Sequence, residues 1–123
     1  MAYFHSSFES LAEQNQNFRK EVFTGSSAQI VLMSLLPNED IGEEVHTDVD
    51  QILFITDGSG KAFIDGAELE LKENDILYIQ RGAKHNIVNT GSDKMKLISV
   101  YAPAEHARGT VHSTKTDALK AEN

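Results

Sequence analysis

Hydrophobic residues in the middle of the chain occur in short runs separated by polar breaks, a pattern typical of β-strands. The runs are rich in Ile, Val, Leu and aromatic residues, and they recur about every ten residues, as in all-β domains. No stretch of helical periodicity interrupts them, which argues against parallel strands joined by helices. The predicted strands are Phe18–Phe23, Gln29–Leu36, Gln51–Thr56, Lys61–Ile64, Glu68–Lys72, Asp75–Ile79, His85–Val88 and Lys96–Tyr101.

Turn residues separate these runs. Asp65-Gly66 lies between two of them and predicts a two-residue hairpin, because both positions tolerate a positive φ. Similar breaks occur at Arg81-Gly82 and Thr90-Gly91. Antiparallel strands of this number in one small domain predict an all-β sandwich, jelly roll or barrel.

Strand 51–56 is apolar on both faces. Alternation places Gln51, Leu53 and Ile55 on one face and Ile52 and Phe54 on the other. We expect one face to line the interior of a barrel and the other to be covered. The cover is either a second subunit, which would make a homodimer, or the N-terminal arm; the alternation does not choose between them.

The length of 123 residues fits one domain. We divide it into an N-terminal arm (1–17), a barrel (18–107) and a C-terminal tail (108–123). In the arm, Ser10 followed by Glu13 has the spacing of a helix cap. The tail is polar without periodicity, and we expect it to be loose.

Charge and cysteine content exclude several functions. The chain has 19 acidic and 11 basic side chains and a net charge of -8, which disfavours nucleic acid and anionic membranes as partners. The absence of cysteine excludes thiolate metal sites and a cysteine nucleophile. No apolar run approaches the roughly 20 residues of a membrane span, and the N-terminus does not resemble a secretory signal. A cytoplasmic protein is therefore expected.

Four side chains have the spacing of a metal site. Glu44 and His46 are two residues apart and share one side of a strand, Gln51 begins the next strand, and His85 begins a later one. Facing strands of a small barrel can bring such donors together around a divalent metal. Asp48 shares the parity of His46 and is an alternative to Gln51. A metal-free polar pocket is the other interpretation.

The segment from Asn38 to Gly58 resembles the first motif of the cupin family. In that motif a Gly precedes His-x-His, then Glu, then a second Gly. Counting back from Gly58 places Gln51 at the Glu position, His46 at the second His and Glu44 at the first. Asn38 stands where the first Gly is expected.

The second cupin motif has its counterpart further along the chain. Gly82, His85 and Asn89 match the family, whereas Asn74 replaces a Gly and Gln80 replaces a Pro. The resemblance implies a double-stranded β-helix, or jelly-roll, barrel. Segment 101–112, after the last predicted strand, resembles the closing segment of the small single-domain cupins labelled mannose-6-phosphate isomerase-like.

The family places its metal on three His and one Glu, so the resemblance implies a metal on Glu44, His46, Gln51 and His85. Compared with the family pattern, Glu44 replaces a His and Gln51 replaces the Glu. One carboxylate therefore remains among the four donors, and the net charge of the donor set, which tunes a bound ion, is unchanged. Two imidazoles and two oxygens suit Fe, Mn, Ni or Zn.

The same resemblance implies a function. We expect an enzyme of the isomerase or dioxygenase type acting on a small oxygen-rich molecule such as a sugar or a diketone; the alternative is a non-catalytic small-molecule-binding module. The acidic residues in segment 38–48 are typical of a solvated loop; if they rim the pocket, they would repel anionic substrates such as sugar phosphates. His106 and His112 either lie over the barrel mouth or belong to a solvated tail, which we favour. No general base is identified.

Overall fold

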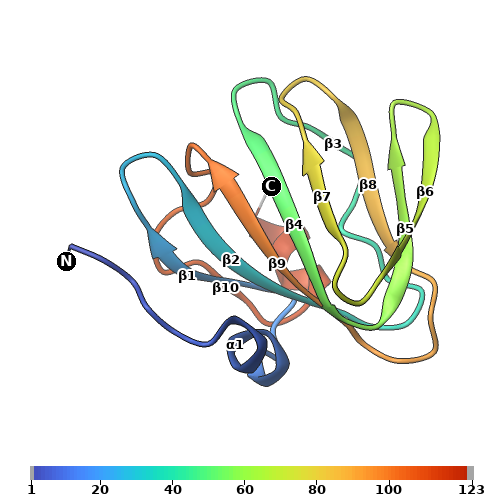
Figure 1. Cartoon of the computed structure of the whole chain (residues 1–123), viewed down its shortest axis with the longest axis horizontal. Helices are drawn as coiled ribbons and strands as arrows, with labels where there is room; N and C mark the ends of the chain where they lie inside the picture. The colour runs from blue at the N-terminus through green and yellow to red at the C-terminus, as the bar shows by residue number, and fades with distance from the viewer. Residues whose placement is uncertain (1, 122–123) are drawn as a thin grey trace.

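The computed structural model describes residues 2–121, and its strands form two antiparallel sheets that face each other (Figure 1). The larger sheet has six strands in the order β10-β1-β2-β9-β4-β7, and the smaller has four in the order β3-β8-β5-β6. The predicted all-β jelly-roll fold is confirmed. The elements are α1 (Phe8–Gln14), β1 (Arg19–Thr24), β2 (Gln29–Leu35), β3 (Glu44–Val45), β4 (Asp50–Asp57), β5 (Ser59–Ile64), β6 (Ala67–Lys72), β7 (Ile76–Ile79), β8 (Lys84–Asn89), β9 (Met95–Ala102), β10 (Val111–His112) and α2 (Lys115–Ala121).

All eight predicted strands are present, with small shifts at their ends. The hairpin between β5 and β6 turns at Asp65 and Gly66, which have φ values of 47° and 86°. At two motif positions where cupins have glycine, Asn38 and Asn74 have φ values of 68° and 73°. Asn tolerates this left-handed conformation better than most residues, so the turns survive both replacements.

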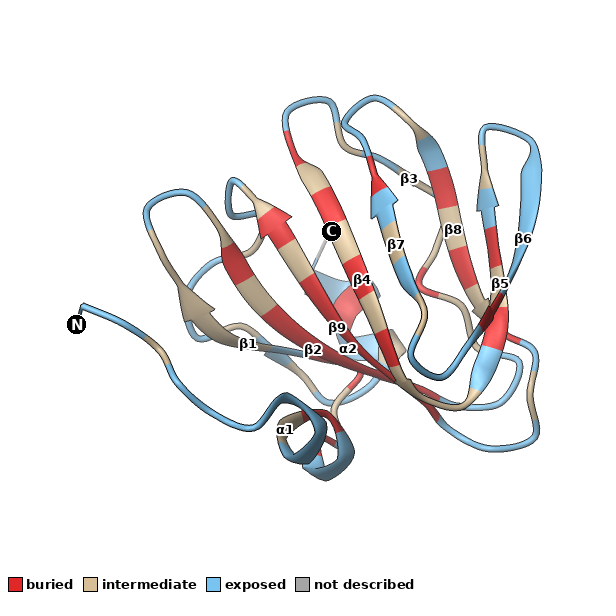
Figure 2. Ribbon diagram, in the orientation of Figure 1, coloured by how far each residue is buried: buried red, intermediate tan, exposed pale blue. Residues whose placement is uncertain are grey.

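The alternation predicted for β4 sets its two faces. Gln51, Leu53 and Ile55 are buried between the sheets, whereas Ile52 and Phe54 are half-buried on the outer face (Figure 2). The buried side chains of both sheets form one core. Its largest fully buried apolar members are Tyr101, Met33, Leu35, Leu53, Ile55, Ile87, Met95 and Leu97.

Helix α1 covers part of the outer face of the larger sheet, so the N-terminal arm supplies at least some of the cover. Ala12 is fully buried against Leu32 and Ile98, and Lys96 Nζ donates a hydrogen bond to the carbonyl of Asn15 at the helix end. The cap is at Ser7, which makes no side-chain hydrogen bond to the helix. The predicted cap at Ser10 is wrong, because Ser10 lies inside the helix.

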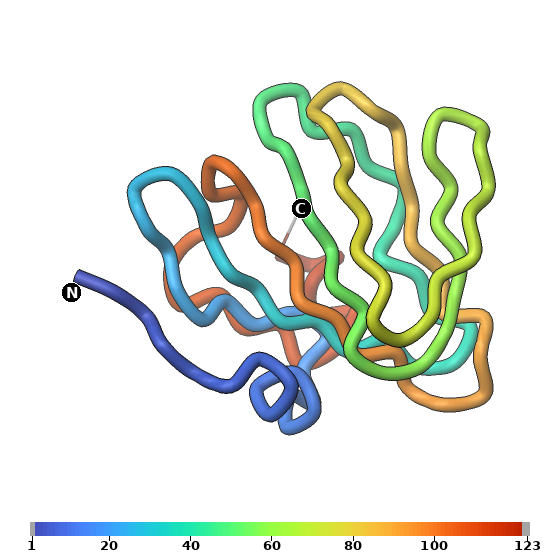
Figure 3. Tube along the Cα trace, viewed as in Figure 1, coloured from blue at the N-terminus to red at the C-terminus, as the bar shows by residue number. Residues whose placement is uncertain are grey.

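The homodimer stays a prediction. Beyond the helix, β7 exposes Ile76 and Tyr78. The tube in Figure 3 shows the N-terminal segment running along the larger sheet before it enters α1.

The prediction of a loose C-terminal tail is wrong for most of that segment. Strand β10 pairs with β1, where His112 lies opposite Arg19, and α2 buries Ala118 in the main core. Lys115 Nζ forms an ion pair with Asp40. Such short elements carry no detectable periodicity, and tertiary contacts hold them. Residues 122–123 of the predicted tail and residue 1 of the predicted arm lie outside the described residues.

Neither helix of the described residues has the length and apolarity that a membrane crossing requires.

Candidate metal centre

Three of the four predicted donors meet between the sheets. One ligand atom from each of Glu44, His46 and His85 lies within 4.8 Å of the others. Glu44 and His85 are directly opposite each other on β3 and β8. His46 follows β3, and its carbonyl accepts a hydrogen bond of 2.7 Å from the backbone N–H of Gly82. The antiparallel pairing of β3 with β8 therefore builds the cluster from residues that are far apart in the sequence.

Three buried side-chain atoms of the predicted donors have no hydrogen-bond partner within the described residues: His46 Nε2, His85 Nε2 and Gln51 Oε1. Leaving a polar atom buried and unpaired costs about 1–3 kcal/mol, so three together call for an explanation. Imidazole nitrogen and amide oxygen are both ligands for divalent metals, and Glu44 adds a carboxylate. The donor set therefore fits a metal ion.

Hydrogen bonds orient two of these donors. His85 Nδ1 lies 3.0 Å from the carbonyl oxygen of Ala83, which can only accept, so the proton is assigned to Nδ1 and the lone pair to Nε2. Gln51 Nε2 donates to Ser99 Oγ at 2.9 Å and to Tyr101 OH at 3.3 Å. Both contacts hold the amide nitrogen of Gln51 toward Ser99 and Tyr101, so the amide oxygen points away from these two hydroxyl groups. The alternative ligand Asp48 is exposed and lies outside the cluster.

The loop after β9 adds a carboxylate that sequence reasoning missed. Glu105 Oε2 lies 3.6 Å from His46 Nδ1. Fully buried Gln29 fixes this loop: its Oε1 accepts from the backbone N–H groups of Glu105 and His106, and its Nε2 donates to the carbonyl of His106. A loop without periodicity carries no sequence signal, and Gln29 was visible only as the first residue of a predicted strand.

His106 and His112 are half-buried, so the interpretation as a solvated tail is wrong. The ring of His106 packs edge-on against Tyr101, with centroids 5.1 Å apart. Burial, helped by the positive charge of Arg19, lowers the pKa of His106 to about 4, and His106 is neutral at pH 7. Burial raises the pKa of Tyr101 to about 12, which keeps its hydroxyl protonated. Neutral rings therefore border the candidate centre.

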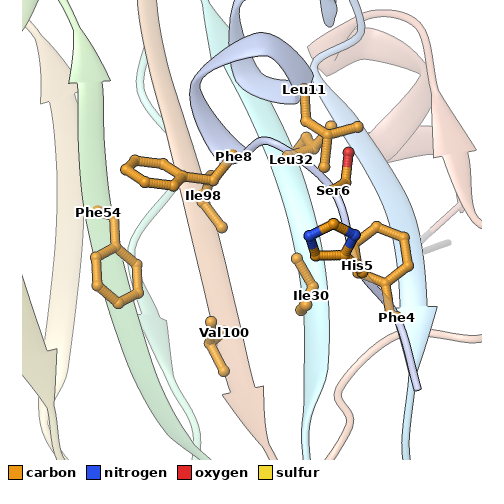
Figure 4. A pocket seen from close by; sticks show the side chains of 10 residues that line it. All are labelled: Phe4, His5, Ser6, Phe8, Leu11, Ile30, Leu32, Phe54, Ile98 and Val100. Carbon is orange, nitrogen blue, oxygen red and sulfur yellow. The ribbon is translucent and has the colours of Figure 1, made fainter. Parts of the chain in front are cut away.

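An apolar cavity of about 370 Å³ lies elsewhere (Figure 4). The N-terminal segment forms one wall of this cavity, with Phe4 and Phe8, and outward side chains of the larger sheet such as Phe54 and Val100 form the other. Gln51 points to the opposite face of the same sheet, since it is offset by an odd number of residues from Phe54. The cavity and the candidate metal centre are therefore separate.

Comparisons with known proteins agree with the fold. Residues 31–101 match the family model described as Cupin domain. The crystal structure of BH2720 from Bacillus halodurans is 36% identical, covers 95% of this chain and 93% of its own, and superposes with a TM-score of 0.94.

The curated relatives of this chain include YrkC and an oxalate-binding protein. YrkC, an uncharacterized protein of Bacillus subtilis, is 41% identical over 117 residues, which are 90% of this chain and 63% of YrkC. This chain thus spans less than two thirds of the length of YrkC. The oxalate-binding protein of Thermotoga maritima is 26% identical over 81 residues, 66% of this chain and 67% of that protein. With its two facing sheets, its converging donors and a family match over more than half its length, this chain belongs to the cupin family.

Proposed function

We propose that this cupin binds a divalent metal through Glu44, His46, Gln51 and His85 and acts on a small oxygen-rich molecule such as a sugar or a diketone. The observation that carries the proposal is the set of unpaired buried acceptors on His46, His85 and Gln51 beside the Glu44 carboxylate. A bound ion would polarise a carbonyl group or hold two neighbouring oxygens of such a molecule. The donor types favour Fe, Mn, Ni or Zn.

The remaining side chains would position and shield the site. Hydrogen bonds from Gln51 to Ser99 and Tyr101 hold its amide in one orientation. Glu105, 3.6 Å from His46 Nδ1, would favour a proton on that nitrogen and leave Nε2 as the donor atom. The buried ring of Tyr101 and the half-buried ring of His106 would shield one side of the site from water. Isomerase and dioxygenase chemistry are both compatible with this arrangement.

The test is elemental analysis of the purified protein and of His85→Ala. We expect a stoichiometric divalent metal in the wild type and its loss in the variant, with an unchanged circular dichroism spectrum. His5→Ala is the matched control, because His5 lies on the outer cavity, and it should retain the metal. A folded His85→Ala protein that keeps its metal would overturn the proposal.

Gln51 has its own test. Gln51→Glu restores the family's carboxylate and should slow loss of the metal to a chelator, because an anionic oxygen is a stronger ligand than a neutral amide. An unchanged rate would place Gln51 outside the metal's coordination.

A non-catalytic binding module is the second candidate, and the printed name of the Thermotoga maritima relative, an oxalate-binding protein, favours it. Assays of aldose–ketose interconversion and of diketone cleavage, with and without air, separate the candidates. Turnover by the metal-loaded wild type that His85→Ala abolishes identifies an enzyme, whereas ligand binding without turnover identifies a binding module.

A further inference from the structure

A buried arginine lies inside the barrel, outside the donor set. Arg19 begins β1 and is only 3% exposed. It lies opposite Met33 of β2, which in turn lies opposite Leu97 of β9. Met33 and Leu97 are fully buried members of the core between the sheets. Because paired residues share a face of the sheet, the side chain of Arg19 points into the barrel, as Gln51 does.

The guanidinium group is incompletely paired. Its Nη1 lies 3.3 Å from His112 Nδ1, and its central carbon lies 5.3 Å from the ring of Phe18. Its Nε is buried and has no hydrogen-bond partner within the described residues. Leaving a buried donor unpaired costs about 1–3 kcal/mol, so this N–H group calls for an acceptor.

The position of Arg19 connects it to the candidate metal centre through Tyr101. The Tyr101 ring packs edge-on against His46 on one side, with centroids 6.1 Å apart, and against His106 on another. Arg19, Glu44 and Glu105 all lie close enough to Tyr101 for their charges to act on its hydroxyl. A ligand bound by Arg19 would therefore share the surroundings of Tyr101 with the candidate donors.

We propose that Arg19 binds the carboxylate of a small organic acid inside the barrel, so that the ligand of this cupin carries a negative charge. Binding of the carboxylate by Arg19 is independent of the proposed function, whereas contact between the rest of the ligand and a metal ion rests on it. Nε belongs to the side-on edge of the guanidinium, and that edge matches a planar carboxylate through two parallel hydrogen bonds.

The acidic segment 38–48 does not oppose this conclusion. Asp40 is paired with Lys115 and accepts a hydrogen bond from Asn86. The side chains of Asp48 and Glu43 are exposed. The positive charge is buried inside the barrel, whereas these negative charges are neutralised or solvated. Within this segment Glu44 is a carboxylate of the candidate metal centre itself, and a bound divalent cation would offset its charge.

Titrations with malonate and with malonamide, its neutral isostere, test the inference. Both are followed by calorimetry and by the ¹⁵N resonance of Arg19 Nε, with and without Mn²⁺. We expect the wild type to bind malonate and not malonamide, with a shift of the Nε resonance. Arg19→Gln should weaken malonate binding by about tenfold or more, because a charge-assisted pair is lost. Arg19→Lys keeps the charge but loses the planar fork, and it should bind with intermediate affinity.

Lys20→Gln is the matched control, because it removes the same charge from the exposed neighbour on β1 and should leave the malonate affinity unchanged. Wild type that binds neither compound, or both equally, overturns the inference. So does a folded Arg19→Gln protein with wild-type affinity. If Arg19→Gln does not fold, the Nε resonance and Arg19→Lys still decide.

Two further outcomes are distinguishable. Inorganic phosphate that binds more tightly than malonate, with the same dependence on Arg19, would replace the carboxylate by a phosphate and refute the assigned class. The protein could also take up no metal and still bind malonate in a manner that depends on Arg19. This outcome would support the anion site and refute the proposed metal function.

Discussion

Gln29, at the start of β2, holds the loop that carries Glu105 and His106 beside the candidate centre. Replacing Gln29 with Leu tests this role. Its side chain is fully buried and makes four hydrogen bonds: two accepted from the N–H groups of Glu105 and His106, and two donated to the His106 carbonyl and Thr24 Oγ1. Leu has a similar volume but leaves these partners unpaired. Because the loop is partly exposed and water can reach some of them, we expect a loss of about 2–4 kcal/mol in the free energy of unfolding.

The same substitution should change the titration of His106. Its pKa is about 4 because the held loop buries the ring, and a released loop should return that pKa toward 6.5. Between these values the unfolded chain binds more protons than the folded one, so wild-type stability falls as the pH drops from about 6.5 to about 4. That acid sensitivity should shrink in Gln29→Leu.

Urea unfolding measures the free energy, and NMR titration of the imidazole measures the pKa. Gln80→Leu, at an exposed position, is the control and should change neither. A loss below about 0.5 kcal/mol, within the range of ordinary surface substitutions, together with an unchanged His106 pKa would refute the assigned role of Gln29.

Three further predictions follow from contacts elsewhere in the fold. Gly60→Ala should lower the unfolding free energy by about 1–3 kcal/mol in urea titrations, because the added Cβ would lie 2.2 Å from the Val88 carbonyl oxygen. A variant as stable as the wild type would contradict this, because β5 and β8 would then have moved apart without cost. Ala118→Glu should detach α2, since it buries a charge in the core; unchanged amide hydrogen exchange in that helix would contradict this. The Tyr78 hydroxyl, 2.5 Å from Asp50 Oδ2, is the main cause of the lowering of the Asp50 pKa to about 2. Tyr78→Phe should therefore raise this pKa toward 3.8 in a carboxyl NMR titration, and the stabilisation from Asp50, which is lost as the pH falls through its folded pKa, should disappear at a higher pH.

The strands could be predicted because their side chains alternate between two environments. Leu53 and Ile55 face the core while Phe54 faces outward, and that periodicity is local information. The hairpin turn at Asp65-Gly66 could be predicted as well, because few residue types adopt its positive φ angles. By contrast, β3 and β10 have two residues each and no period at all, and only their partner strands define them.

The donors Glu44, His46 and His85 could be found from their chemistry and spacing, because metal ligands need particular residue types. Arg19, Gln29 and Glu105 could not. Their importance depends on which groups remain unpaired after folding, and that depends on contacts between residues distant in the sequence. Arg19 in particular looks like any charged residue at the start of a strand until its burial is known.

The proposed donors come from both walls of the barrel. Gln51 is on the six-stranded sheet, whereas Glu44 and His85 are on the four-stranded one. The distance between the two sheets, which the hydrophobic core fixes, would therefore set the separation between Gln51 and the other donors. Core residues such as Leu53 and Ile87, which touch no ion, would then act as spacers. Repacking them offers a route to shift preference among cations of different radius without replacing a single coordinating atom.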